Sequence, residues 1–333
     1  MRSTADRCAF VAAMLFNLLL WPVGAVPAVA ATGAQSYPVK PLRLVVPFPA
    51  GASSDIVGRM LGEKLAEQMG EQIVADNRPG AGGNVGIGFT AKSPPDGYTI
   101  VIATSSIAVS PSLYLKLGYD PVKDLAPVAR LTSIPNVLVV HPSVPAKTLR
   151  QFVALARAHP GKLNFGSGGA GTTNHLANEL LKHLEKIDMV HVPYKGVTQA
   201  MVAMMGGEVD EVVMPVASAL PHIRAGKVRA LAVLSEARIA ALPDVATATE
   251  AGIPGLTLSV WYGMFAPAAT PREIVVRLNR ELVKALETPD LRERLAAIGV
   301  DPWPGTSEQL GELLRTEIET FGRVVRAANL PRQ

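Results

Sequence analysis

Strand-like and helix-like stretches alternate along this chain in two separate runs, and this alternation limits the possible folds more than any other feature. The first run has β-type stretches at residues 42–48, 72–75 and 98–103, with helical stretches between them. A strand-helix-strand order of this kind forms a parallel sheet whose faces are covered by helices. We therefore expect an α/β protein whose ligand lies at the carboxyl ends of its strands.

The alternation restarts after Leu131, which indicates a second lobe. A strand-like stretch at residues 257–265 is placed to lead the chain back to the first lobe, and helical stretches at 274–286, 290–298 and 308–328 follow it. We expect residues 37–134 plus 263–333 to form lobe 1 and residues 135–262 to form lobe 2. The second run consists of strands at 137–140, 162–165, 190–192, 209–214 and 228–233, and helices at 149–158, 199–205 and 218–225.

A glycine-rich turn in the second run is the strongest candidate for a binding site. Gly166, Gly168, Gly169 and Gly171 stand between a short apolar strand and an amphipathic helix. Glycine permits unusual backbone angles and leaves N–H groups accessible. The positive end of the helix dipole also favours a negative charge. A carboxylate or a phosphate is the expected ligand.

The residues of this turn also allow two enzyme interpretations. Gly166, Gly168 and Gly171 match the dinucleotide pattern G-x-G-x-x-G, but the next strand ends without the acid that would bind a ribose. Ser167 lacks the G-x-S-x-G motif of a hydrolase. The alternative function is that of a secreted α/β enzyme, which would bind a nucleotide or an anionic substrate at this turn.

The following helix carries three residues of metal-ligand type. His175, Glu179 and His183 recur every four residues, but the H-E-x-x-H motif is absent. A surface stripe with a packed His175 is the favoured interpretation, and we expect neither a metal nor a cofactor.

The first strand ends in a second turn of small residues. Pro47 and Pro49 end the strand because proline donates no hydrogen bond. Ser53 or Ser54 can cap the next helix, and Asp55 suits its positive end. One such turn from each lobe would enclose an anion from both sides of a cleft.

The N-terminus has the pattern of a signal peptide over residues 1–30. Arg2 and Arg7 precede a largely apolar stretch, and Ala28-Val29-Ala30 supplies small residues for cleavage. Export to the periplasm is expected. Cys8 is the single cysteine and lies within this segment, so the mature chain has no disulfide. A net charge of +4 without a basic run gives no reason to expect nucleic acid as a partner.

Several motifs occur in order along the chain. They are Pro47-Phe48-Pro49-Ala50-Gly51 with Asp55, Asn77-Arg78-Pro79-Gly80-Ala81-Gly82-Gly83, Asp96-Gly97-Tyr98, Gly166-Ser167-Gly168-Gly169 with Gly171-Thr172 and His175-Leu176, Val192-Pro193-Tyr194-Lys195-Gly196, and Leu242-Pro243-Asp244-Val245. These motifs resemble those of the Bug (TctC) family, the periplasmic receptors of tripartite tricarboxylate transporters. The resemblance implies a two-lobed type II (Venus flytrap) periplasmic binding fold with a β-sheet core in each lobe, a monomer without catalysis, a small carboxylate ligand, and membrane subunits of the transporter as partners.

The resemblance also implies which residues hold the ligand. Ala52 stands where the family usually has a second glycine, and Met214-Pro215 is an unusual end for its strand, so both are expected to affect the cleft. The expected binding residues are Phe48, Pro49, Ala50, Gly51, Ala52, Ser53, Ser54, Asp55, Ser105, Ser106, Ser167, Gly168, Gly171, Thr172, Thr173 and Met214.

Overall fold

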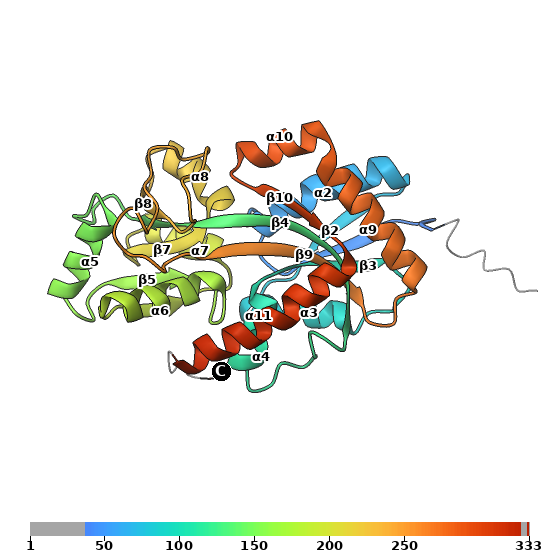
Figure 1. The fold of residues 1–333 in the computed structure, drawn as a ribbon, viewed down its shortest axis with the longest axis horizontal. Helices are drawn as coiled ribbons and strands as arrows, with labels where there is room; N and C mark the ends of the chain where they lie inside the picture. The colour runs from blue at the N-terminus through green and yellow to red at the C-terminus, as the bar shows by residue number, and fades with distance from the viewer. Residues whose placement is uncertain (1–36, 328–331, 333) are drawn as a thin grey trace, which may run out of the picture. The chain divides into compact units, whose positions relative to one another are not determined.

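The computed structural model describes residues 37–327 and residue 332, and the predicted signal peptide lies outside the described residues. Hydrogen bonds connect strands in the order β2-β1-β3-β9-β4-β7-β5-β6, and β8 and β10 also pair with β4 (Figure 1). The strands are β1 (Leu42–Val46), β2 (Ile73–Asn77), β3 (Thr99–Thr104), β4 (Leu125–Val140), β5 (Asn164–Ser167), β6 (Val190–Pro193), β7 (Glu211–Pro215), β8 (Arg229–Val233), β9 (Ser259–Pro267) and β10 (Asp301–Gly305).

Helices cover both faces of these strands (Figure 1). They are α2 (Ser53–Met69), α3 (Asn84–Ala91), α4 (Ser106–Leu113), α5 (Leu149–Ala158), α6 (Thr173–Glu185), α7 (Val197–Met205), α8 (Val216–Arg224), α9 (Arg272–Glu287), α10 (Pro289–Ala297) and α11 (Ser307–Ala327), with a 3₁₀ turn, η1 (Ala81–Gly83). None of the described helices combines the length and the apolar character needed to cross a bilayer.

The parallel arrangement predicted for the first run is confirmed. β1 pairs in parallel with both β2 and β3. Leu44 and Val46 of β1 pack with α2 and α9, whereas Val45 faces the opposite side and packs with α4 and α11. Apolar residues on both faces of a strand are typical of a parallel sheet between two helical layers.

The long strand β4 links two groups of strands. Its first part pairs antiparallel with β9 as far as Pro135, and its last part pairs with β7 and β8 from Asn136 onward. β7 in turn pairs in parallel with β5, which pairs in parallel with β6. β4 and β9 therefore run side by side as the connection between the two groups (Figure 1).

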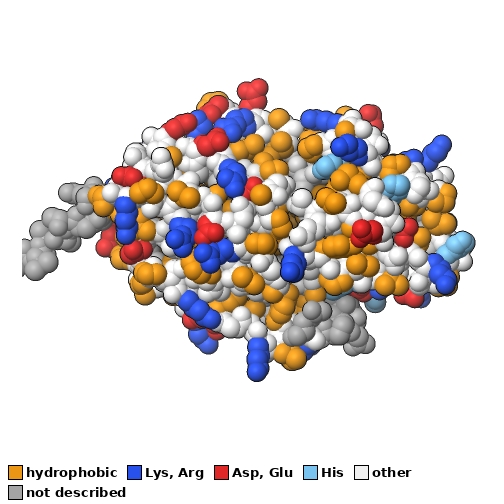
Figure 2. All heavy atoms as spheres, turned by 180° about the vertical axis from the view of Figure 1, so that it is seen from behind, with side chains coloured by type: hydrophobic (Ala, Val, Ile, Leu, Met, Phe, Trp, Pro, Cys, Tyr) orange, Lys and Arg blue, Asp and Glu red, His pale blue; other side chains and the backbone are white. Residues whose placement is uncertain are grey.

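Four strands lead almost directly into helices. β1 is followed by α2, β3 by α4, β5 by α6 and β7 by α8. In a sheet of this type the turns after the strands gather at the carboxyl edge. On the face shown in Figure 2, Lys and Arg side chains are interspersed with Asp and Glu.

Candidate functional site

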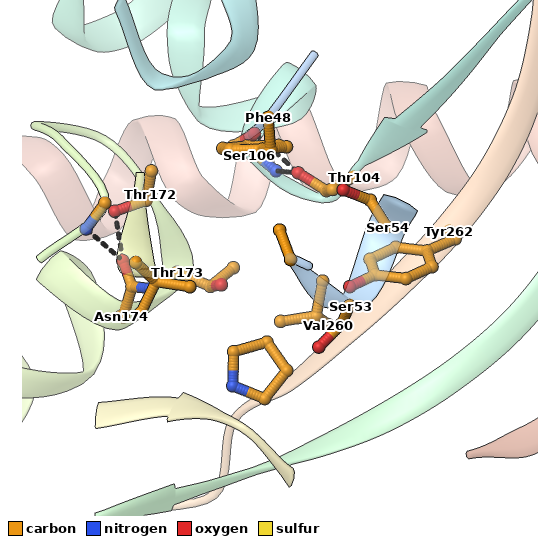
Figure 3. Close-up of a pocket in the computed structure, with 14 residues that line it drawn as sticks. Phe48, Ser53, Ser54, Thr104, Ser106, Thr172, Thr173, Asn174, Val260 and Tyr262 are labelled. Atoms are coloured by element: carbon orange, nitrogen blue, oxygen red, sulfur yellow. Dashed lines mark hydrogen bonds between the residues drawn. The ribbon is translucent and has the colours of Figure 1, made fainter. Parts of the chain in front are cut away.

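A pocket lies where the turn after β1 approaches the turn after β5 (Figure 3). It leaves about 40 Å³ to the centres of water-sized spheres. One water needs roughly 10–15 Å³ by the same measure, so the pocket has room for a short ligand. Its lining residues are Phe48, Ala52, Ser53, Ser54, Thr104, Ser106, Gly168, Thr172, Thr173, Asn174, Val197, Pro215, Val260 and Tyr262.

Half of the expected binding residues line this pocket, from both turns and from the start of α4. They are Phe48, Ala52, Ser53, Ser54, Ser106, Gly168, Thr172 and Thr173. The structure places the other eight outside the lining: Pro49, Ala50, Gly51, Asp55, Ser105, Ser167, Gly171 and Met214. Met214 lies in a core cluster with Val137 and Val212, and its neighbour Pro215 reaches the pocket instead.

The first turns of several helices point toward this space. Ser53 and Ser54 begin α2, Ser106 begins α4, and Thr173 begins α6. The first amide groups of a helix have no partner within that helix, and they carry the positive end of its dipole. A pocket lined by the N-terminal ends of three helices therefore favours a bound anion.

Asp55 fixes the turn after β1 and does not enter the pocket. Its carboxylate accepts hydrogen bonds from Gly51 N at 3.0 Å, Arg59 Nε at 2.9 Å and Asn77 Nδ2 at 3.0 Å. Burial works to raise the pKa of Asp55, but the bonds from Arg59, Gly51 and Asn77 hold that pKa below its ordinary value. The Arg59 guanidinium group is therefore already hydrogen-bonded within this turn.

The hydroxyl groups in the pocket differ in how they are partnered. Ser53 Oγ shares a hydrogen bond of 2.6 Å with Ser218 Oγ on α8, and Thr104 Oγ1 shares one of 2.7 Å with Ser106 Oγ. Ser54 Oγ is buried and has no hydrogen-bond partner among the described residues. A buried hydroxyl without a partner is costly, so Ser54 is a natural donor for a bound ligand.

The glycine turn is held by its own side chains. Gly168 N donates to Asn174 Oδ1 at 3.3 Å, and Thr172 Oγ1 donates to Gly169 O at 2.6 Å. Ser167 is fully buried, and its Oγ lies 2.6 Å from His191 Nε2. Ser167 therefore stabilises the turn through His191 and does not line the pocket.

Two stacked histidines complete this support. The His175 and His191 rings lie 4.1 Å apart, and Gly171 N donates to His175 Nδ1 at 3.3 Å. Burial, helped by the Lys182 charge, lowers the pKa of His175 to about 4. Burial also lowers the pKa of His191 to about 4, with smaller contributions from His175 and Lys182. Both rings are neutral near pH 7.

This pair predicts an acid-sensitive fold. As pH falls from 6.5 toward 4, the unfolded chain takes up protons at both histidines before the folded chain does, so stability falls. We expect the free energy of unfolding to drop by roughly 2 kcal/mol or more across this range. His191→Gln should show a smaller drop in denaturant titrations at each pH. His183→Gln changes an exposed position of α6, so its free energy of unfolding should fall as much as that of the wild type. Equal drops in wild type and His191→Gln would contradict this assignment.

Each turn also contacts a third segment outside the pocket: Ala170 contacts Tyr114 at the end of α4, and Pro49 contacts Gly196 just before α7. Tyr114 Oη donates to Ala170 O at 2.9 Å. A Cβ at Gly196, where φ is +154°, would lie 2.5 Å from Pro49 Cδ, so glycine permits this close approach. Lys195 lines a neighbouring hollow with Tyr114, Gly169 and Tyr194, outside the pocket. Within the described part of the chain, no group of three His, Cys, Asp or Glu side chains is arranged to hold a metal.

Five lining residues escaped the sequence interpretation: Thr104, Asn174, Val197, Val260 and Tyr262. Pro215 was expected to affect the cleft but was not among the expected binding residues. Thr104 and Pro215 each end a strand, and Val197 begins a helix, so their positions at element boundaries were a usable signal. Val260 and Tyr262 lie within β9 and carry no comparable signal.

Comparisons with known proteins agree on one family. A family model described as the tripartite tricarboxylate transporter family receptor (TctC) matches residues 57–330. Protein BugT of Bordetella pertussis (strain Tohama I) is 37% identical over 299 residues, covering 89% of this chain and 92% of BugT. The resemblance inferred from the motifs is thus confirmed.

Solved structures agree with the predicted fold class. The R. palustris protein Rpa4515, solved with adipate, has a TM-score of 0.87 and 33% identity, over 89% of this chain and all of that one. The periplasmic binding protein BugD has a TM-score of 0.86 and 30% identity, with the same coverage. The two-lobed type II periplasmic binding fold is confirmed by these likenesses.

Proposed function

Since this chain belongs to the TctC family of tripartite tricarboxylate transporter receptors, we propose that it captures a small carboxylate in the periplasm and delivers it to the membrane subunits of such a transporter. It is a solute-binding receptor by family and fold. In this proposal it acts as a monomer and without catalysis, after removal of residues 1–30.

The observation that carries this proposal is the lining of the pocket. Helix starts from α2, α4 and α6 converge on it with the hydroxyls of Ser54 and Thr173, whereas the Ser106 hydroxyl already donates to Gly82 O at 3.1 Å. None of its described lining residues is Lys, Arg, Asp or Glu. Such a site attracts an anion through dipoles and neutral donors without an ion pair. The relative Rpa4515, solved with the dicarboxylate adipate, supports a carboxylate as the guest.

The expected binding energy is sufficient for a receptor. Each helix terminus contributes up to about 2 kcal/mol to an anion in a partly buried site. A neutral hydrogen bond contributes about 1 kcal/mol. Two helix ends and four hydrogen bonds reach the roughly 8 kcal/mol of a micromolar complex.

The proposed lobes are residues 37–134 plus 263–333 and residues 135–262. The change of partners along β4 between Pro135 and Asn136 supports the first boundary. Packing of α9 and α11 against clusters that contain β1 residues supports the assignment of the C-terminal helices to lobe 1.

Two lobes that share one ligand should close on it. A guest that contacts both turns stabilises the closed state by its higher affinity for that state. Small-angle scattering should give a smaller radius of gyration with saturating ligand than without it. An unchanged radius would contradict closure.

Native mass spectrometry of protein purified from the periplasm tests the function itself. We expect one retained carboxylate per chain, and calorimetry with that compound should give one-to-one binding. Recovery of the compound unchanged after incubation separates a receptor from an enzyme. Turnover of the compound, or a change in nicotinamide absorbance, would favour the enzyme alternative.

A further inference from the structure

The glycine-rich turn after β5 has two sides that face different spaces. Gly168 and Thr172 line the pocket, whereas Gly169 and Ala170 line the neighbouring hollow. Ala170 is almost fully buried although it does not line the pocket. Contacts on this outer side therefore fix the position of the pocket-lining residues without touching a bound ligand.

The end of α4 makes contacts of this kind. Tyr114, the C-cap residue of α4, donates from its Oη to Ala170 O at 2.9 Å. A Cβ at Gly171, where φ is +78°, would lie 2.7 Å from Leu113 Cδ2, so glycine permits this close packing. Leu113 and Ala170 belong to one buried apolar cluster. Burial raises the pKa of Tyr114, so its hydroxyl group keeps the proton that it donates.

The 3₁₀ turn η1 approaches the glycine turn from the same side. A Cβ at Gly82 would lie 3.0 Å from Ala170 O and 3.2 Å from Tyr114 Oη. Gly82 O accepts a hydrogen bond from Ser106 Oγ at 3.1 Å, and Ser106 begins α4 at the pocket. Ala170 lies in the proposed lobe 2, whereas the other three residues lie in the proposed lobe 1. These contacts therefore join the two lobes beside the pocket.

Given the proposed function and the proposed lobes, we infer that Tyr114 is a positioning residue for the glycine turn and that its contact with Ala170 forms a latch between the closed lobes. The latch must break before a bound carboxylate can leave, although Tyr114 lies outside the pocket lining. One neutral hydrogen bond in the closed state slows dissociation roughly three- to tenfold. Association starts from open lobes, before this bond forms, so its rate does not depend on Tyr114.

Tyr114→Phe removes only the hydroxyl group and tests the latch. Stopped-flow kinetics should use the carboxylate retained from the periplasm, or adipate if none is retained. We expect dissociation roughly three- to tenfold faster than in the wild type, with association within about twofold of it. Tyr119→Phe is the matched control, because Tyr119 Oη donates to Asn84 Oδ1 at 2.8 Å and both residues lie in the proposed lobe 1. This control should lose stability in denaturant titrations and keep wild-type rates.

The outcomes separate the latch from the proposed function. Wild-type dissociation in Tyr114→Phe, or equally fast dissociation in Tyr119→Phe, would overturn the latch and leave carboxylate capture intact. A change in association alone would also overturn it. If the wild-type protein binds neither a retained carboxylate nor adipate, the proposed function fails, and the latch fails with it.

Gly82→Ala tests the same contact from η1. The added Cβ meets Ala170 O and Tyr114 Oη, so the two lobes cannot approach as closely. Gly207→Ala is the matched control: φ is +77° there and +65° at Gly82, but a Cβ at Gly207 has no neighbour within 4 Å. Dissociation should be at least about threefold faster in Gly82→Ala than in Gly207→Ala. Equal rates would overturn the inference, and this pair decides if Tyr114→Phe fails to fold.

Discussion

Gly168→Ala should weaken carboxylate binding by at least tenfold. A Cβ at Gly168 would lie 2.9 Å from Val197 N and 3.4 Å from Gly196 C. These are backbone atoms, so the start of α7 must shift away from the glycine turn. Gly168 and Val197 both line the pocket. A shift of this kind moves one wall of the site, and a tenfold loss corresponds to about 1.4 kcal/mol. Calorimetry with the retained carboxylate measures it.

Two control variants identify the cause of that loss. Gly206→Ala, at the other end of α7, adds a Cβ no closer than 3.4 Å to its neighbours, and it should bind normally. Lys195→Ala removes a cation that lines the outer hollow together with Gly169, outside the pocket, so only a small loss is expected. If Lys195→Ala abolishes binding and Gly168→Ala does not, an ion pair holds the ligand.

Ser54→Ala should change affinity and stability in opposite directions. Ser54 Oγ is buried at the pocket without a partner in the described part of the chain. Its removal relieves an unsatisfied polar group, so the free energy of unfolding without ligand should stay constant or rise by about 1 kcal/mol. A hydrogen bond to a charged ligand contributes about 1.5–3 kcal/mol, so affinity should fall by tenfold or more. Denaturant titration and calorimetry give the two quantities.

Ser110→Ala is the matched control. Ser110 is also a buried serine, but its Oγ already donates to Ser106 O at 2.9 Å. Its removal should lower stability slightly and leave affinity close to that of the wild type. A Ser54→Ala protein that is less stable and binds as well as the wild type would show that Ser54 has a structural role only.

The alternation of strands and helices could be predicted because it depends on local periodicity. β4 was recognised only over its last four residues, since Pro127 and Pro135 interrupt the apolar pattern in the rest. These positions are tolerated where β4 changes register or changes partners. β10 was missed because Asp301–Gly305 contains two prolines and is defined by its pairing with β4.

The candidate site likewise contains residues that local sequence patterns predict and residues that only long-range strand pairing brings to the pocket. Ser53, Ser54, Gly168 and Thr172 lie in turns of small and polar residues that the sequence shows directly. The expected serine cap is wrong, because Ala52 is the N-cap of α2 and no side chain caps that helix. Val260 and Tyr262 reach the pocket only because β9 runs between β3 and β4, which depends on long-range pairing. Met214 was expected at the ligand, but strand alternation turns it into the core and brings Pro215 to the pocket.

A crystal structure of the complex with the retained carboxylate would show whether helix starts and neutral donors hold the charge. We expect carboxylate oxygens within about 2.7–3.2 Å of Ser54 Oγ and of donors in the first turn of α6, and no Lys or Arg nitrogen within hydrogen-bond distance. A carboxylate in the outer hollow, paired with Lys195 Nζ, would contradict this expectation.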